Sequence, residues 1–220
     1  VPFLLHVLTE AEVLNTEGQP ELEATRTHLE ADRPEALLQL TQTWLKSSTH
    51  NDLHLVPQLQ VEGEWQNDPL GARHFIINLL QKLPQDTWWN LSAFVADIRQ
   101  AQPDFQRPAG DYDSWYLKDA QSGEFLRGFE HWNDVDGALI RHLIRGPMYW
   151  LGMIDLATSD EDQPASKASA FRLSGWAADL LAGIAPEGIP AESEAIHLRS
   201  NGRIGVPRLS PRSARYQIAR

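Results

Sequence analysis

The 220-residue sequence contains no cysteine, and its apolar runs are short. The absence of cysteine excludes disulfides and thiolate metal ligands, and it is typical of proteins in a reducing compartment. The longest apolar stretches, Phe75-Ile76-Ile77 and Met148 to Ile154, fall far short of the length needed to cross a bilayer. We therefore expect a cytoplasmic protein without a membrane partner.

The sequence also lacks catalytic motifs. It has no phosphate-binding GxxxxGK[ST] loop, so ATPase chemistry cannot be placed on it, and no GxSxG nucleophile motif. His50 and His54 are four residues apart, but the turn-forming Asn51-Asp52 between them disfavours a helical zinc pair. We expect no catalytic residues, no metal and no cofactor.

Basic residues are scarce in most of the chain, which carries a formal net charge of −11. Residues 1–110 hold fifteen acids and seven bases, and residues 111–190 hold thirteen acids and six bases. Residues 191–220 reverse the balance with two acids and six arginines. An acidic surface repels phosphate backbones, so this distribution counts against nucleic-acid binding by the body of the chain.

The most informative stretch begins with a helix over residues 134–145. Ala138, Leu139, His142 and Leu143 recur at helical spacing, which indicates one apolar face. Gly146-Pro147 ends this helix and allows a second short turn to begin at Pro147. A strand is predicted over residues 153–156.

The second half of this stretch predicts a hairpin and a closing helix. A returning strand over residues 170–173 follows a polar loop, and Ser174 is the expected N-cap of a helix over residues 175–182, with Gly183 as its C-cap. A helix followed by a two-stranded hairpin is typical of the end of a winged-helix domain.

The sequence before residue 134 predicts the remaining elements of the winged-helix order. Helices are predicted over 34–47, 69–83 and 87–100, and a loose alternation over 55–61 indicates a strand. Residues 101–133 form a Pro/Gly-rich insertion with a small hairpin. We assign residues 1–67 to a partial winged-helix-like unit and helical linker, residues 68–183 to a winged-helix domain with the insertion at 101–133, and residues 184–220 to a linker and the start of a following domain.

Two further observations concern the ends of the chain. The sequence begins Val-Pro-Phe without an initiator Met, and it stops at Arg220 inside an expected arginine-rich helix. Ala195 to Val206 predict two short strands around Asn201-Gly202, a dipeptide suited to a tight turn. We expect a fragment of a longer chain, whose other domains would be its partners.

Several short motifs resemble a known family. They are NDL at 51–53, NDP at 67–69, PDFQRP at 103–108, GDYDSWYLKD at 110–119, GEFLRGFEHW at 123–132, GPMYWLGMIDL at 146–156, NGRIGVPR at 201–208 and RYQIAR at 215–220. Together they resemble a large bacterial family described as XPB-like or helicase-associated. That resemblance implies stacked winged-helix units upstream of a helicase-like domain, and a DNA-related role.

The candidate nucleic-acid contacts follow from the winged-helix prediction. Such domains place their third helix in the major groove, and here that helix carries Arg141, His142 and Arg145, with Lys167 and Arg172 on the hairpin. The carboxylates of Asp134 and Asp136 in the first turn of this helix interact favourably with the helix dipole, but they repel the phosphates of DNA. The tail adds a basic patch with an adjacent aromatic residue, made of Arg199, Arg203, Arg208, Arg212, Arg215 and Tyr216. Alternatively, these arginines pair with the acidic body or with another domain.

A third possible site lies in the insertion, where Asp111, Asp113, Asp119, Glu124, Glu130 and His131 gather. Paired carboxylates can serve in acid–base chemistry, but charged loop clusters are usually solvated, and this one lacks the spacing of a calcium loop. The eight tryptophans are interpreted as core residues.

The sequence thus predicts an α+β, mainly α fold of winged helix-turn-helix units with short β-hairpins. The expected function is that of a non-enzymatic module of a helicase-associated protein that contacts double-stranded DNA. The alternative is a protein–protein interaction scaffold without DNA contact.

Overall fold

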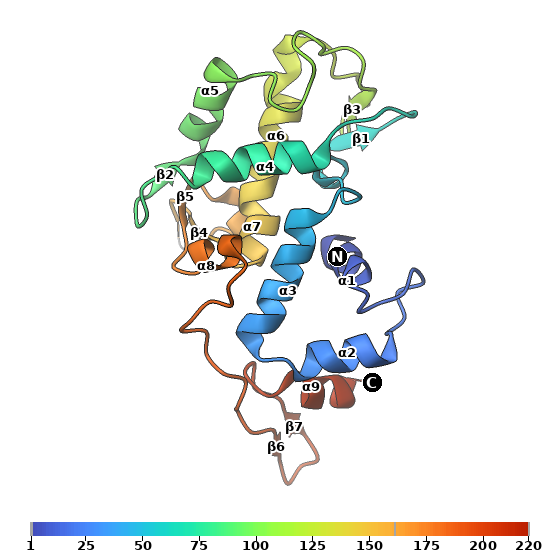
Figure 1. The fold of residues 1–220 in the computed structure, drawn as a ribbon, viewed down its shortest axis with the longest axis vertical. Helices are drawn as coiled ribbons and strands as arrows, with labels where there is room; N and C mark the ends of the chain where they lie inside the picture. The colour runs from blue at the N-terminus through green and yellow to red at the C-terminus, as the bar shows by residue number, and fades with distance from the viewer. Residues whose placement is uncertain (1, 161, 220) are drawn as a thin grey trace. The chain divides into compact units, whose positions relative to one another are not determined.

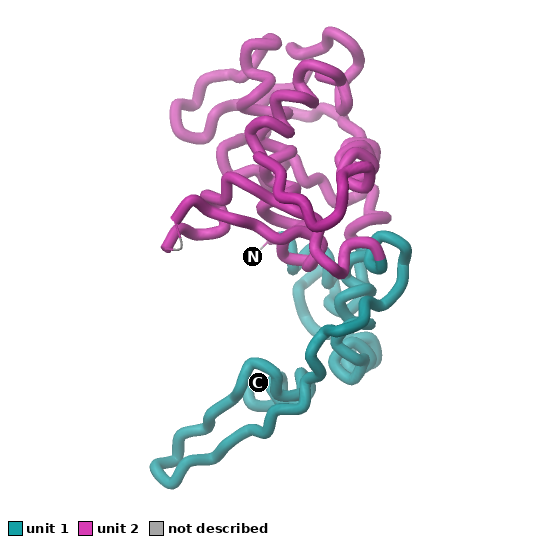
Figure 2. Tube along the Cα trace, turned by 90° about the vertical axis from the view of Figure 1, so that its left-hand side faces the viewer, with its two compact units in different colours: residues 1, 3–43, 179–220 teal, residues 2, 44–178 magenta. Residues whose placement is uncertain are grey.

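The computed structural model describes residues 2–160 and 162–219, and it divides into two compact units. Among the described residues, one unit comprises residues 3–43 and 179–219, and the other comprises Pro2 and residues 44–160 and 162–178 (Figure 2). The described fold is α+β and mainly helical, as the sequence predicts. We call the two parts the terminal unit and the central unit.

The terminal unit brings the two ends of the chain together. Helix α9 packs on helix α2, and Arg212 of α9 donates a hydrogen bond to the carbonyl oxygen of Ala31 (Figure 1). The Thr25 hydroxyl donates to the Val13 carbonyl oxygen at 2.7 Å and fixes the turn before α2. The elements of this unit are α1 (Pro2–Glu10), α2 (Leu22–Glu30), most of α3 (Arg33–Lys46), the end of α8 (Ala177–Ala182), β6 (His197–Leu198), β7 (Ile204–Gly205) and α9 (Arg212–Ala219).

The central unit contains two small sheets and four further α-helices among its described residues. Its elements are η1 (Asp52–Leu55), β1 (Leu59–Val61), α4 (Pro69–Leu80), β2 (Trp89–Asn90), α5 (Leu91–Ala101), β3 (Leu117–Asp119), η2 (Phe129–His131), α6 (Trp132–Arg145), α7 (Pro147–Trp150), β4 (Ile154–Ala157), η3 (Ala165–Lys167) and β5 (Ala170–Leu173).

The larger sheet of the central unit is antiparallel, with the strand order β2-β5-β4. Phe171 of β5 lies between Trp89 of β2 and Leu156 of β4, and its side chain is fully buried. The second sheet pairs β1 with β3, so the turn-rich segment before α4 is tied to the insertion. Sequence periodicity predicts β4 and β5 but gives no indication of β2.

Helix α6 is the centre of this core. Eight of its residues are buried, and α6 packs against α5 (Figure 1). The four largest aliphatic contributors, Leu139, Ile140, Leu143 and Ile144, recur at helical spacing and are at most 2% exposed. At about 1.5–3 kcal/mol for each fully buried aliphatic side chain, this stripe is a major source of stability for the unit.

Several predicted boundaries were wrong by a few residues. Helix α5 begins at Leu91 and not at Thr87, because Trp89 and Asn90 pair with β5 and the Asn90 side chain then caps the helix by accepting from Ala93 N at 2.9 Å. Helix α4 ends at Leu80, α6 begins at Trp132, and the strand predicted at 55–61 is limited to Leu59–Val61.

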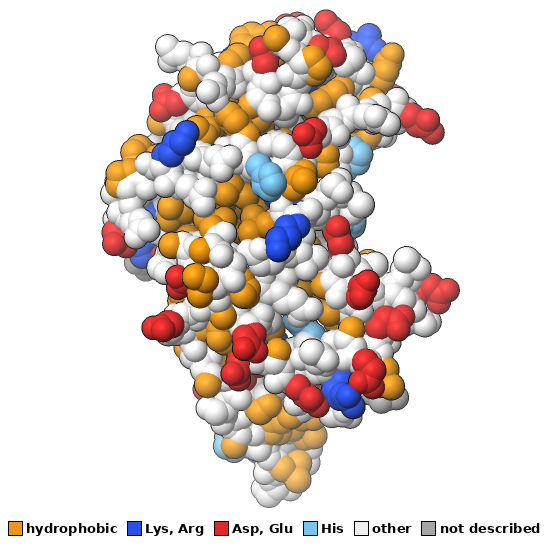
Figure 3. Space-filling view, viewed as in Figure 1, with side chains coloured by type: hydrophobic (Ala, Val, Ile, Leu, Met, Phe, Trp, Pro, Cys, Tyr) orange, Lys and Arg blue, Asp and Glu red, His pale blue; other side chains and the backbone are white. Residues whose placement is uncertain are grey.

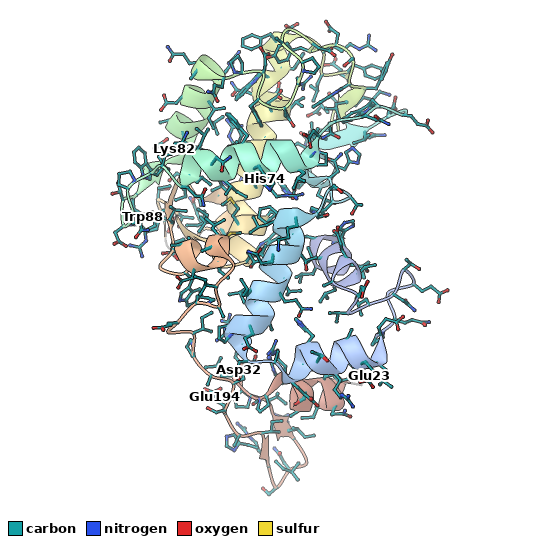
Figure 4. All side chains as sticks on the ribbon, viewed as in Figure 1. Glu23, Asp32, His74, Lys82, Trp88 and Glu194 are labelled. Atoms are coloured by element: carbon teal, nitrogen blue, oxygen red, sulfur yellow. The ribbon has the colours of Figure 1, made fainter. Side chains whose placement is uncertain are left out.

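The interpretation of all tryptophans as core residues was also wrong. Trp44 and Trp132 are fully buried, but Trp88 is 45% exposed and Trp150 is 51% exposed. Trp88 lies in the turn before β2 (Figure 4), and Trp150 ends the short helix α7. Both side chains are therefore only partly covered, next to the end of an element.

Candidate nucleic-acid interface

The outer side of α6 holds the residues that the sequence assigns to DNA contact. Asn133 and Asp134 are exposed in the first turn, and Arg141 and Arg145 are partly exposed further along the helix. Asp136, which the sequence placed in the same acidic first turn, is instead fully buried and bonds Gln106 and Arg107 of the insertion. Only Asp134 therefore presents a carboxylate on this side of the first turn.

Arg145 joins α6 to the β4–β5 hairpin. Its Nε and Nη2 atoms donate to the carbonyl oxygen of Ala168, at 3.0 Å and 2.6 Å. Arg141 reaches back along the helix, and its Nη1 donates to the carbonyl oxygen of Asn133 at 3.2 Å. Both acceptors are neutral, so the positive charges of the two guanidinium groups stay uncompensated by direct ion pairs.

The two arginines are also close enough to repel each other. Partial burial lowers the pKa of Arg145, and the neighbouring charge of Arg141 lowers it further. Burial likewise lowers the pKa of Arg141, opposed by the charge of Asp134. Such groups stay protonated at neutral pH because an arginine begins from a very high pKa. The pair is therefore a local concentration of positive charge that an anion would stabilise.

Lys167 extends this charge onto the hairpin. It ends the turn η3, its side chain is exposed, and it directly precedes Ala168, the residue that Arg145 holds. We call Arg141, Arg145 and Lys167 the basic strip. None of the three forms a salt bridge within residues 2–160 and 162–219, although the charge of Asp134 acts on Arg141.

The other two candidates of the central unit lie differently. His142 is partly buried; burial lowers its pKa, and its ring meets the edge of Trp150 at a centroid distance of 6.4 Å. Arg172 forms an ion pair with Asp155 at 2.9 Å and lies over the ring of Trp88 at 4.9 Å. His142 thus packs within the protein, and the charge of Arg172 is already compensated.

The basic tail belongs to the terminal unit. Arg212 and Arg215 each contact one carboxylate oxygen of Glu192 at 2.7 Å. Arg203 and Arg208 are exposed and form no ion pair among the described residues. The acid that Arg212 and Arg215 contact thus belongs to the tail itself, and pairing of the tail arginines with the acidic body or with another domain stays a prediction.

The carboxylates of the insertion serve the local backbone. Asp111 accepts from the Ser114 hydroxyl at 2.6 Å and from its backbone N–H, and these bonds hold the pKa of Asp111 below its usual range. Asp119 accepts from the backbone of Gln121 and Ser122 with the same effect on its pKa. His131 instead bonds Asp134. In the described chain, no group of three acidic or histidine residues could hold a metal ion.

Two buried clusters were missed by the sequence reasoning. Arg73 pairs with Asp52, and Arg107 pairs with Asp136, all at most 7% exposed. Asp52 and Arg107 lie in the quoted motifs NDL and PDFQRP. Both motifs fall in turn-rich segments, where charged side chains are expected to be exposed to solvent. A charged residue within an apolar helical stretch, as Arg73 is in α4, was the one available signal.

Comparison of the chain with protein-family models, with curated proteins and with solved structures finds no match. The resemblance to helicase-associated proteins therefore stays a prediction that depends on the quoted motifs. Each helix in the described part of the chain is too short or too polar to span a membrane.

Proposed function

We propose that the central unit is a non-enzymatic winged-helix module that positions double-stranded DNA through the basic strip. In the order α4, β2, α5, α6, β4, β5, one strand lies between the first two helices and two strands follow the third helix. The three strands form one antiparallel sheet with the order β2-β5-β4. In this interpretation α6 is the recognition helix and the β4–β5 hairpin is the wing.

One observation carries the proposal: the Arg145 guanidinium on the Ala168 carbonyl oxygen. This bond fixes the spacing between the recognition helix and the wing, and it leaves a net positive charge where the two meet. Phosphate contacts position a protein on a duplex without reading sequence, and they come mainly from arginine and lysine. The role that fits the strip is therefore backbone contact.

The acidic character of the chain, with a formal net charge of −11, limits the strength of this contact. Acidic side chains are spread over the face shown in Figure 3, where basic side chains are sparse. Asp134 is exposed at the start of α6 itself. We expect weak binding that disappears as salt screens the three cations. As part of a helicase-associated protein, such a module would orient a duplex that another domain holds.

The test is fluorescence anisotropy of a labelled duplex titrated with the protein at about 20 mM and then about 200 mM salt. Lys167→Gln should weaken binding and reduce the salt slope by about one, and Arg145→Gln should weaken it more. Lys82→Gln is the matched control, because Lys82 is an exposed lysine at the end of α4, outside the strip (Figure 4). Equal losses for Lys167→Gln and Lys82→Gln would reject the strip as the contact.

A protein–protein scaffold is the second candidate, and a specific observation favours it. Tyr149 and Trp150 of α7 are 40% and 51% exposed, directly after the recognition helix. Aromatic residues of this kind are enriched at protein interfaces. Absence of duplex binding even at low salt, together with binding of a partner protein that Trp150→Ala abolishes, would replace the DNA proposal with this one.

A further inference from the structure

The β6–β7 hairpin of the terminal unit has one apolar face without a cover. Leu198 pairs with Ile204 across the strands, and the same register sets Ile196 opposite Val206. Side chains two residues apart point to the same face of a strand, so these four share one face. Leu198 is 77% exposed, Ile204 52% and Val206 39%. Figure 3 shows hydrophobic side chains gathered over this hairpin.

The opposite face of the hairpin is basic. Arg199 N donates to the Arg203 carbonyl oxygen at 2.8 Å, which places these two arginines opposite each other beside the turn at Gly202. His197 shares their face by alternation. All three are exposed, and neither arginine forms an ion pair within the described residues. The hairpin therefore presents an apolar surface and a cluster of positive charge close together.

A surface of the opposite character lies elsewhere in the same unit. An open pocket of about 670 Å³ is formed where α1 ends and α2 begins. Its lining combines three glutamates with apolar side chains, and the residues are Thr9, Glu12, Leu14, Asn15, Thr16, Glu21, Leu22, Glu23 and Ala24. Leu22 is 78% exposed. Residues 1–30 carry six glutamates and one arginine.

We propose that the apolar face of the β6–β7 hairpin docks into the α1–α2 pocket of a second copy of this chain. Leu198 and Ile204 would bury their side chains against Leu14 and Leu22. The long side chains of Arg199 and Arg203 on the other face would reach past the edges of the hairpin toward Glu12 and Glu21, because Glu23 already pairs with Arg26. Exposed apolar surface next to complementary charge is the pattern of an interaction site. A nucleic acid would satisfy the arginines and leave the four aliphatic side chains in water.

The contact joins two different surfaces, so it is heterologous. Such contacts generate closed rings or open chains and not a symmetric pair. Association should therefore increase with protein concentration beyond a dimer and should weaken at about 0.5 M salt, because the charges in it lie at the surface.

Two complementary variants test the proposal. Leu198→Ser/Ile204→Ser removes the apolar hairpin face and keeps the pocket. Glu21→Lys/Leu22→Ser alters the pocket and keeps the hairpin. All four positions are exposed, so circular dichroism and the melting temperature should match those of the unchanged chain. Ile184→Ser, at an exposed position outside both surfaces, is the matched control.

Sedimentation velocity gives the readout. Each variant alone should be monomeric, and an equimolar mixture of the two should form a one-to-one heterodimer, since one intact hairpin meets one intact pocket. Losing one buried leucine should weaken association by about ten-fold or more. Ile184→Ser should associate as the unchanged chain does.

Three results would overturn the proposal. The unchanged chain could stay monomeric at all concentrations. The pocket variant could dimerise alone, which would mean that hairpins pair with each other. The mixture of the two variants could also remain monomeric while the unchanged chain associates, which would place the contact on other surfaces.

Discussion

The central unit contains two buried arginine–aspartate clusters that differ in how completely they are satisfied. In the first, which we call the Arg73 cluster, Arg73 binds Asp52 through Nε at 3.0 Å and Nη2 at 2.7 Å. Its other N–H groups donate to the backbone carbonyl oxygens of Trp44, Ser47 and His50 at 2.7–2.8 Å. All five donors of this guanidinium group are thus satisfied inside the protein.

Asp52 is equally well supported. Its Oδ1 accepts from the Trp44 indole at 3.0 Å and contacts His50 Nε2 at 3.1 Å. Burial alone would raise its pKa, but the His50 hydrogen bond and the Arg73 charge more than offset burial, and the pKa of Asp52 is lowered. The ionised form is therefore the one that this site stabilises.

The second cluster is built around Arg107 and is less complete. Asp136 accepts from Arg107 Nε at 3.1 Å and Nη2 at 3.0 Å, and from Gln106 Nε2 at 2.7 Å. The remaining donors of Arg107 have no carbonyl acceptor among the described residues, and its guanidinium lies over the rings of Trp115 and Tyr112, at 4.3 Å and 5.2 Å. Gln106 Oε1 is buried without a partner in the described chain.

Asp136 responds in the opposite direction from Asp52. Burial raises its pKa, and the charge of Arg107 and the Gln106 hydrogen bond only partly oppose this effect. The difference teaches that an arginine partner does not by itself determine the protonation of a buried carboxylate. What matters is how many further donors compensate the loss of water.

The largest expected effect is that of removing Arg73. Arg73→Met leaves the Asp52 carboxylate buried without its charged partner and removes the arginine donors from the carbonyl oxygens of Trp44, Ser47 and His50. We therefore expect a loss of about 3–5 kcal/mol in the free energy of unfolding. Arg107→Met should cost less, because Asp136 can take up a proton and aromatic packing remains. Urea denaturation followed by circular dichroism measures both, and equal losses would contradict the comparison.

The two aspartates should contribute to stability with opposite dependence on pH in the acid range. The folded pKa of Asp52 lies below 3.8, so its contribution is present above that pH and is lost as the pH falls below it. The folded pKa of Asp136 lies above 3.8, so its contribution is present below 3.8 and is lost as the pH rises through the folded value.

Denaturation of Asp52→Asn, Asp136→Asn and the unchanged chain at several pH values from 3 to 6 tests these signs. The stability advantage of the unchanged chain over Asp52→Asn should shrink as the pH falls. Its advantage over Asp136→Asn should grow as the pH falls. Parallel curves would mean that neither aspartate changes its pKa on folding.

A smaller effect is expected from His142, beside the Arg73 cluster. Burial lowers its pKa from 6.5, with smaller and opposing influences from Asp52 and His50. A depressed histidine pKa stabilises the fold above pH 6.5, and this stability is lost as the pH falls through the folded value, by less than about 1.4 kcal/mol per pH unit. His142→Gln should reduce the fall of the melting temperature between pH 7 and pH 5.5. His197→Gln, at an exposed position, should leave this pH dependence unchanged.

The smallest effect is expected at Gly137, next to Asp136. A Cβ there would lie 2.9 Å from Arg141 Nη1, which can move, and 3.3 Å from Val95 Cγ1, which is buried. Alanine gains about 1 kcal/mol in helix propensity, so the net change in stability should stay within about 1 kcal/mol. In an Arg141→Ala background the same substitution should be more favourable. A larger loss in thermal stability would show that Val95 cannot adjust.

Local chemistry let the sequence determine the elements that depend on nearby residues. Asp68 caps α4 by accepting from Gly71 N at 2.8 Å, Pro147 opens α7, and Gly202 takes a φ of +79° in the tight turn of the hairpin. The apolar stripe of α6 and the strands β4 and β5 were predicted for the same reason. Each of these features is set by spacing and turn chemistry within a few residues.

Only the tertiary structure decided which distant segments meet. The two residues of β2 pair with β5 about eighty positions later, and β1 pairs with β3 across the start of the insertion. Arg73, Arg107 and Asp136 have the same residue types as solvated charges, and burial arises from partners far away in the chain. Periodicity reports which face of an element is apolar, but it does not identify the partner that compensates a buried charge.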